Sequence, residues 1–324
     1  MSWLTFHFQD FSYSFLSILF EGIPFLLLGS LVSGLVDAFV PSETLTKILP
    51  KNGVLAICLS GLLGGIFPMC ECGSVIMIRR FIKKGLPVSA AITYMLASPI
   101  VNPIVALSTF TAFRSQSPWL MMSLRVLIGY LIAVAGGLIA RKVQVDKLLQ
   151  PAILATLKGP KRTAFKFSAS PDMVEDIDMG VGATNGFRTK VMRAAQSATS
   201  DFLDVAFFLV IGAAIASVFN TSVNQSIIQP LAGSTLLSII AMMGLRFILA
   251  LCSTSDAFIA ASFVSFPYVS KLAFLVFGAM FDIKLLFLYQ LVFRRRFVLF
   301  LGIGLSITVV LICFYISTLH ALHL

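Results

Sequence analysis

The sequence predicts an all-α membrane protein with several membrane crossings, built from two inverted repeats. The 324 residues are 58% hydrophobic and only 12% charged, roughly half the charged fraction of a soluble domain. Apolar runs occur at residues 15–36, 117–140 and 297–318. Each matches the roughly 20 residues that a helix needs to cross the hydrocarbon layer. A recurring pattern of polar residues in the two halves predicts the repeat.

The rest of the composition narrows the chemistry. The N-terminus has no basic region and no small-residue cleavage site, so we expect its first apolar run to be a retained helix. The net charge of +10 comes from basic residues between apolar segments, which is typical of topology signals and headgroup contacts rather than nucleic-acid binding. We expect free thiols from the five cysteines. The three histidines lie near the termini, so carboxylates and thiols must carry any interior chemistry.

The two halves align at a nearly constant offset. The matched pairs are Glu21 and Asp204, Gly29 and Gly212, Pro50 and Pro230, Gly53 and Gly233, and Cys70 and Cys252. In each half an opening span with an early acid precedes two short apolar arms around a polar break, a segment with polar residues near its middle, and a closing span. We therefore expect about three full spans and a broken helical hairpin in each repeat, or roughly 8–10 hydrophobic segments in all.

This pattern divides the chain into three parts. Residues 1–140 form the first transmembrane repeat, residues 141–200 a cytoplasmic polar linker, and residues 201–324 the second transmembrane repeat. Prolines and glycines at positions such as Pro151 and Pro171 interrupt helical periodicity in the linker.

The distribution of lysine and arginine predicts how the arms run. If each polar break lay within one continuous span, the basic residues would divide almost evenly between the two sides. The alternative is that the arms around each break form a hairpin, in which the second arm returns to the side where the first began. Nearly all of the basic residues then fall on the cytoplasmic side, and only Arg114 and Lys271 fall outside. We therefore expect hairpins, either re-entrant or fully spanning. Each repeat then crosses an odd number of times, so the second repeat is inverted and both termini lie outside the cytoplasm.

The arms are short. Those at residues 54–67 and 74–81 are shorter than a full span, which favours a re-entrant hairpin whose tip is buried in protein. The same holds less firmly for the arms at residues 234–250 and 256–266.

The first polar break places thiols and a carboxylate in an apolar chain. Cys70 and Cys72 can approach one soft ligand, such as a trivalent arsenical or a thiophilic metal, and Cys252 from the second break can supply a third thiol. The alternative is that these cysteines act as small apolar residues. A structural zinc site is disfavoured, because the interior lacks further cysteine and histidine ligands.

Small polar residues open the second arm of each break. Gly73-Ser74 and Thr254-Ser255 place exposed N–H groups at a helix N-terminus, where an anionic or polar substrate group would bind. The alternative is that they only cap a broken helix.

Ionisable side chains within membrane segments mark substrate or proton pathways by default. Asp256 and Asp282 are the first candidates. Glu21, Glu71 and Asp204 follow. The alternative for each acid is structural pairing with Arg125, Arg246 or Lys284.

A third polar break lies in the middle of an apolar segment. Pro99 and Pro103 remove helical hydrogen bonds there. Ser98 and Asn102 then become candidate binding groups, with a packed proline kink as the alternative.

These patterns define the predicted site residues. The predicted substrate-binding residues are Cys70, Glu71, Cys72, Gly73, Ser98, Asn102, Cys252, Ser253, Thr254, Ser255, Asp256 and Asp282. The predicted ion-coupling residues are Glu21, Asp204, Asp256 and Asp282. No catalytic residue, resident metal or cofactor is predicted.

Three stretches together resemble one family. They are residues 68–113, beginning PMCECGS, residues 251–263, LCSTSDAFIAASF, and residues 277–284, FGAMFDIK. They are similar to the predicted-permease family that includes the bacterial organoarsenical efflux permeases. The resemblance implies a permease of the bacterial cytoplasmic membrane, with efflux of trivalent organoarsenicals by some members.

The resemblance also carries residue roles. It implies arsenic binding by the thiols of Cys70, Cys72 and Cys252. Glu71 between the thiols is typical of the broader, uncharacterised branch of the family, and Ile76 and Ala279 stand where relatives often have proline.

We therefore expect a secondary-active permease that exports a small solute by alternating access around a midplane site. The alternatives are a membrane thiol-disulfide enzyme that uses Cys70 and Cys72, and a non-transporting subunit of a larger membrane complex. The expected partners are the lipid bilayer and a small-molecule or ion substrate, with a second membrane protein or another copy of the chain as further candidates. Nucleic acid is not expected.

Overall fold

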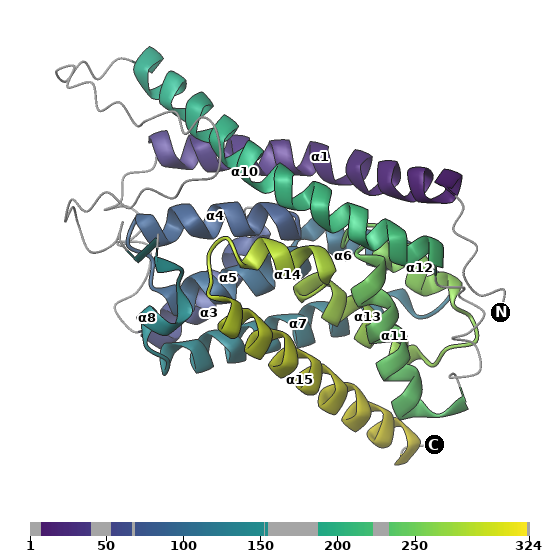
Figure 1. Cartoon of the computed structure of the whole chain (residues 1–324). Helices are drawn as coiled ribbons and strands as arrows, with labels where there is room; N and C mark the ends of the chain where they lie inside the picture. The colour runs from purple at the N-terminus through teal and green to yellow at the C-terminus, as the bar shows by residue number, and fades with distance from the viewer. Residues whose placement is uncertain are drawn as a thin grey trace.

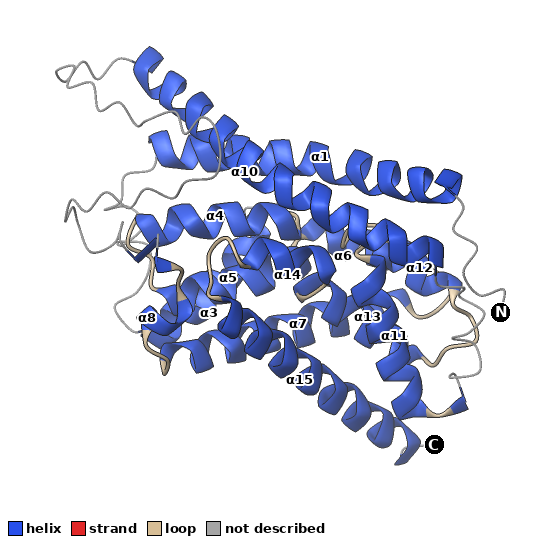
Figure 2. Cartoon of the chain, in the orientation of Figure 1, coloured by secondary structure: helices blue, strands red, loops and turns tan. Residues whose placement is uncertain are grey.

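The computed structural model describes residues 8–39, 53–66, 69–151, 153–154, 187–222 and 233–322. These residues are almost entirely helical, and within them the only β-type pairing is an isolated bridge between Leu149 and Phe293 (Figure 2). Six segments in these ranges are long and apolar enough to cross a membrane. The prediction of an all-α membrane protein with several crossings is therefore confirmed.

The described part of the chain is a succession of α-helices (Figure 1). The first half contains α1 (Phe8–Phe39), α3 (Gly53–Ile66), α4 (Glu71–Lys83), α5 (Val88–Val101), α6 (Pro103–Ala112), α7 (Pro118–Arg141) and α8 (Val145–Leu148). The second half contains α10 (Phe187–Ser222), α11 (Thr235–Leu249), α12 (Asp256–Ser262), α13 (Tyr268–Met280), α14 (Ile283–Tyr289) and α15 (Arg295–Leu322).

One span in each half is a pair of short helices. Asn102 ends α5 and caps α6, because its side-chain oxygen accepts a hydrogen bond from the Ile104 N–H at 2.9 Å. Asp282 plays the same part between α13 and α14, accepting from the Leu285 N–H at 2.8 Å. The predicted unwinding therefore occurs at Asn102, whereas Pro99 lies inside α5.

The arms around the first polar break go down and back. Helix α3 runs alongside α5 in the same direction, because Gly61 lies against Thr93 and Gly64 lies against Ser98. Gly61 also lies against Tyr130, near the middle of α7. The end of α3 is thus level with the break between α5 and α6, and α4 returns from there to the turn that starts α5. Helices α3 and α4 therefore form a helical hairpin, and whether it is re-entrant or spans the membrane fully stays open.

The second half repeats this packing. Near the starts of α11 and α13, the hydroxyl oxygens of Ser238 and Ser270 lie 2.7 Å apart, and Gly278 packs against Arg246 near their ends. Helix α13 begins beside the end of α6, where Lys271 Nζ donates to Gln116 Oε1 at 2.7 Å, whereas α5 begins at the opposite end of the bundle. Which end faces the cytoplasm, and with it the inverted repeat in the membrane, stays a prediction.

Helices α1 and α10 cross side by side in antiparallel directions (Figure 1). Gly22 lies against Leu209, and Gly34 lies against Ala194 and Ala198, because small residues let two membrane helices approach closely. Burial of these alanines against α1 explains why α10 already begins at Phe187, inside the stretch predicted as linker. Residues 152 and 155–186 of that predicted linker lie outside the described residues.

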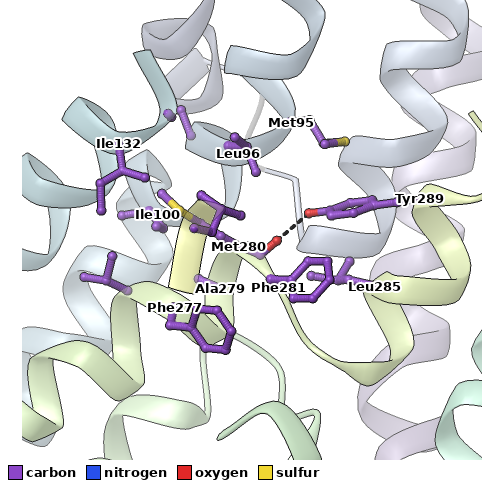
Figure 3. Close-up of a cluster of buried hydrophobic side chains, with 14 of the residues drawn as sticks. Met95, Leu96, Ile100, Ile132, Phe277, Ala279, Met280, Phe281, Leu285 and Tyr289 are labelled. Atoms are coloured by element: carbon purple, nitrogen blue, oxygen red, sulfur yellow. Dashed lines mark hydrogen bonds between the residues drawn. The ribbon is translucent and has the colours of Figure 1, made fainter. Parts of the chain in front are cut away.

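The two halves share one apolar core (Figure 3). Met95 and Leu96 of α5 are fully buried, as are Met280 of α13 and Leu285 of α14. Tyr289 also lies there, and its hydroxyl donates to the Met280 carbonyl oxygen at 2.6 Å. This bond satisfies a carbonyl that the break after α13 leaves without a helical partner. Apolar packing thus joins the halves around the broken helices.

Two neighbouring glycines test the packing of α3 on α5. In Gly64→Ala the added Cβ would lie 2.6 Å from Ser98 Cα, so the helices must separate, and we expect a loss of about 1–3 kcal/mol. In Gly65→Ala the nearest atom would be 3.7 Å away, so stability should stay equal or rise by about 0.5 kcal/mol. Apparent Tm values in detergent measure both effects. Equal Tm values for the two variants would contradict the close contact.

Candidate functional site

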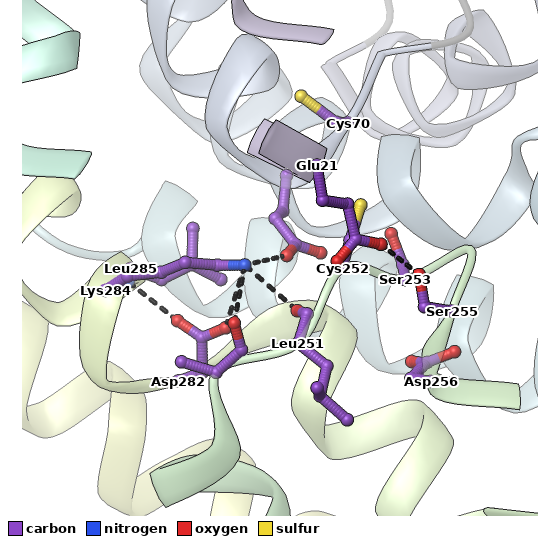
Figure 4. A network of polar contacts seen from close by, with 12 residues as sticks. Glu21, Cys70, Leu251, Cys252, Ser253, Ser255, Asp256, Asp282, Lys284 and Leu285 are labelled. Atoms are coloured by element: carbon purple, nitrogen blue, oxygen red, sulfur yellow. Dashed lines mark hydrogen bonds and ion pairs between the residues drawn. The ribbon is translucent and has the colours of Figure 1, made fainter. Parts of the chain in front are cut away.

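The two polar breaks meet beside α1, α10 and α14 (Figure 4). Between them lies a cavity of about 20 Å³, enough for one water molecule. Its polar and thiol lining consists of Glu21, Cys70, Glu71, Cys72, Cys252 and Lys284. The structure therefore brings together five of the residues predicted from sequence, and adds Lys284.

The first tip is held by short-range capping and close packing. Cys70 precedes α4, and its Sγ accepts a hydrogen bond from the Gly73 N–H at 3.3 Å. Ser74 Oγ donates back to the Glu71 carbonyl oxygen at 2.8 Å. A Cβ added at Gly29 of α1 would lie 3.1 Å from Gly73 Cα. Cys70 is thus the residue that caps α4, Gly73 is packed against α1, and substrate binding at Gly73 and Ser74 stays a prediction.

The second tip turns sharply after α11. Ala250 has a φ of 47°, in the left-handed region that a residue with a Cβ rarely adopts. The turn directs the carbonyl oxygens of Ala250 and Leu251 toward Lys284 Nζ, at 3.0 and 2.9 Å. On the other side of the tip, Ser255 donates to the Glu21 carboxylate of α1. The second break therefore exposes backbone acceptors to the centre of the molecule.

Asp256 lies between two arginines. Arg125 of α7 contacts Asp256 at 2.9 Å, and Arg246 of α11 lies 3.8 Å from the same carboxylate oxygen. Arg125 also donates to Thr109 Oγ1 at 2.8 Å and to the Ser253 carbonyl oxygen at 3.1 Å. The side chains of both arginines and of Asp256 are fully buried. These contacts anchor the second tip to α6 and α7 of the first half.

A second set of ion pairs continues from Arg246 to the first tip. Arg246 lies 3.4 Å from Asp282, and Lys284 lies 3.7 Å from Asp282 and 2.6 Å from Glu71. The pairing that the sequence offered as an alternative is thus formed for Glu71, Asp256 and Asp282. The residues alternate in charge in the order Arg125, Asp256, Arg246, Asp282, Lys284 and Glu71.

The sequence named the basic members of this network only as partners. Lys284, Arg125 and Arg246 were therefore not among the predicted site residues. Burial of any charged side chain within a membrane segment is costly, and that signal applies equally to lysine and arginine. Counting intramembrane charges of both signs would have found them.

Other predicted residues lie away from the cavity. Ser98 and Asn102 are buried at the end of α5 and do not line it. Asp204 of α10 is 49% exposed and pairs with Arg79 of α4 at 3.1 Å. Asp204 therefore differs from Glu21, its sequence counterpart, which lines the cavity.

The thiols are free and mostly enclosed. All five cysteines are unpaired, and Cys72 and Cys252 are only 5% and 8% exposed. Across the described ranges no group of three or more cysteine, histidine or acidic residues is close enough to hold a metal ion. Cys70, Cys72 and Cys252 line one cavity without forming a ready-made metal-ligand set.

Comparison with known proteins identifies the family. The sequence matches the family described as "Predicted permease" over residues 7–319. The chain belongs to this permease family. The permease is 36% identical over 299 residues to the UPF0718 protein YcgR of Bacillus subtilis, with 92% of this chain and 93% of that protein covered.

A second relative carries a more specific description. Over 308 residues the permease is 31% identical to a putative two-component membrane permease complex subunit of Streptococcus mutans, with 94% of each chain covered. No solved structure matches. The family and the six apolar segments in the described ranges make the permease a multi-pass membrane protein, as predicted.

Two aspartates test the difference between buried and exposed ion pairs. Asp256→Asn leaves Arg125 without its carboxylate in a fully buried position, so we expect a loss of about 3–5 kcal/mol. Asp204→Asn removes a partner from an ion pair whose acid is 49% exposed, and should change stability by less than about 1 kcal/mol. Thermal unfolding in detergent compares the two. Similar losses would contradict the burial of the Asp256 network.

Proposed function

We propose that the permease is a secondary-active transporter that moves a small solute by alternating access around the cavity between the two polar breaks. One observation supports it most: the cavity lies where both broken tips meet, and it is lined by residues of both halves. Broken helices that meet near the middle of the membrane form the substrate sites of many secondary transporters.

The proposal accounts for the position of the polar groups. Irregular backbone is tolerated at membrane depth only where protein or a cavity surrounds it. The N-terminus of α4 and the C-terminus of α11 both lie at this cavity. The cavity therefore adjoins helix ends of opposite partial charge. Such a site recognises polar or ionic groups.

The thiols favour a soft solute, with efflux of a trivalent organoarsenical as our leading candidate. Cys70, Cys72 and Cys252 line the cavity together, and thiols are the side chains that bind soft metals and metalloids. The cavity of about 20 Å³ is too small for such a solute. The two tips must therefore separate to admit it, and alternating access supplies that movement.

Glu21 is the carboxylate best placed for ion coupling. It lines the cavity, is partly exposed, and accepts a hydrogen bond from Ser255. Among the described residues it has no basic partner within 4.0 Å, whereas Glu71, Asp256 and Asp282 all have one. A proton or small cation can therefore reach Glu21 without first breaking an ion pair.

Cysteine variants test the soft-solute proposal. In an arsenic-sensitive bacterial host, Cys70→Ser and Cys72→Ser should reduce resistance to phenylarsine oxide to the level of the empty host, because a hydroxyl binds soft metalloids weakly. Cys313→Ser is the matched control, since Cys313 is buried in α15 and does not line the cavity. Full resistance in both tip variants would contradict a thiol role. An equal loss in the control would indicate that the variants fail to fold.

Transport in membrane vesicles tests the coupling. Uptake of the trivalent organoarsenical into everted vesicles should depend on an imposed pH or ion gradient. Glu21→Gln should remove that dependence, because the amide cannot exchange a proton. Asp204→Asn serves as control, since Asp204 lies away from the cavity. Uptake that stays unchanged after collapse of both gradients would contradict secondary-active coupling.

A second candidate role is that of a subunit in a two-component permease complex. The description of the Streptococcus mutans relative favours it. Purification of the tagged permease from its native membrane in mild detergent should then yield one stoichiometric membrane partner. Transport by the permease alone in proteoliposomes would contradict an obligatory partner.

A further inference from the structure

Lys284 extends into a cluster of oxygen atoms at the meeting point of the two halves (Figure 4). Its Nζ lies 2.6 Å from Glu71 Oε1, and 2.9 and 3.0 Å from the carbonyl oxygens of Leu251 and Ala250. Asp282 Oδ2 lies 3.7 Å away. The ammonium donates hydrogen bonds to the two carbonyl oxygens, whereas its contact with Glu71 Oε1 is an ion pair without a hydrogen bond. We call these four oxygen-bearing residues the oxygen cage.

The oxygen cage resembles a binding site for a small inorganic cation. Hard cations take carboxylate and backbone carbonyl oxygens as ligands. The carbonyls of Ala250 and Leu251 follow the C-terminus of α11, where the helix dipole favours positive charge. The left-handed conformation of Ala250 frees these carbonyls from the helix. The Leu251 oxygen also accepts a hydrogen bond from Arg246 Nη2 at 2.9 Å, so only its second lone pair is available to an ion. In transporters with broken helices, such unwound carbonyls and helix C-termini hold the coupling ion.

The charge around the oxygen cage indicates a monovalent cation. The network has the carboxylates of Glu71, Asp256 and Asp282, whereas without Lys284 it would have only the two arginines. Arginine stays charged in proteins, so a single negative charge would need compensation. Glu21 faces the same cavity, but it is partly exposed and is bonded to Ser255.

The ammonium can leave while the oxygen cage stays in place. A Cβ added at Gly212 of α10 would lie 2.9 Å from Lys284 Cα, so the backbone of Lys284 is held tightly. Its four-carbon stem remains flexible, and the cavity adjoins it. Glu71 Oε2 is buried and has no hydrogen-bond partner among the described residues. That oxygen is therefore a free ligand for an incoming cation.

We propose that the oxygen cage is a site for a small monovalent cation, and that Lys284 fills it as a tethered competitor. The inference rests on the proposed function, because it assigns a coupling ion to the same cavity. Entry of a cation displaces the ammonium and breaks the contact between Glu71 of α4 and Lys284 of α14. The bound cation then links Glu71 of the first half to Ala250, Leu251 and Asp282 of the second half, so the connection between the two tips comes to depend on an ion that can leave.

Purified full-length Lys284→Met in detergent tests the site without any transported solute. Its apparent Tm should rise by about 5 °C in sodium chloride relative to choline chloride at equal ionic strength, because a bound ion stabilises the folded state. The wild type should show a smaller difference, since a cation must first displace its own ammonium from the oxygen cage. The double variant Glu71→Gln with Lys284→Met is the matched control: it removes one charge of each sign, and its sodium response should be lost.

The remaining outcomes of this experiment also decide whether the cation site exists. A folded Lys284→Met without a sodium response, or with a response to calcium chloride alone, overturns the monovalent site. Lys284→Gln keeps donors for the two carbonyls and replaces Lys284→Met where that variant does not fold in choline. If neither variant folds even when produced and purified in sodium, the proposal is wrong. Failure of wild-type transport would contradict the proposed function without changing these binding results.

Discussion

The structure depends on one constraint: charge buried within a membrane protein must be paired. An unpaired ion in a low-dielectric interior is too costly to keep, whereas a paired ion restricts where its partners can lie. Asp256 and Arg125 are both fully buried and 2.9 Å apart. Their contact requires the second tip to lie against α7 of the first half. The network that extends through Arg246 and Lys284 to Glu71 holds both tips in the same place.

The broken helices serve this network and the cavity together. Each break frees backbone groups that need partners, and the network supplies several of them. Arg125 donates to the carbonyl of Ser253, and Lys284 donates to those of Ala250 and Leu251. The breaks would be unfavourable in lipid. Surrounded by paired charges and protein, they become a polar centre that joins the two halves.

Much of the fold was predictable from local chemistry. Span length and apolar composition predicted an all-α membrane protein. The positions of glycine, proline and small polar residues predicted the breaks near Cys70, Asn102 and Cys252. Helix α10 begins earlier than expected, at Phe187, because its alanines bury against α1, and a local sequence pattern does not reveal which face another helix will cover. The orientation of the repeats in the membrane stays a prediction, since it follows from the basic residues alone.

The sequence by itself determined which residue types interrupt the spans: thiols, carboxylates and helix-capping groups at recurring positions in two halves. The tertiary structure alone decided which of them meet. It brought Cys70, Glu71 and Cys252 to one cavity, placed Asp204 on an exposed part of α10, and made Lys284 the neighbour of Glu71. The physical reason is that pairing between distant charges depends on how the helices cross, and crossing is set by packing that no local pattern encodes.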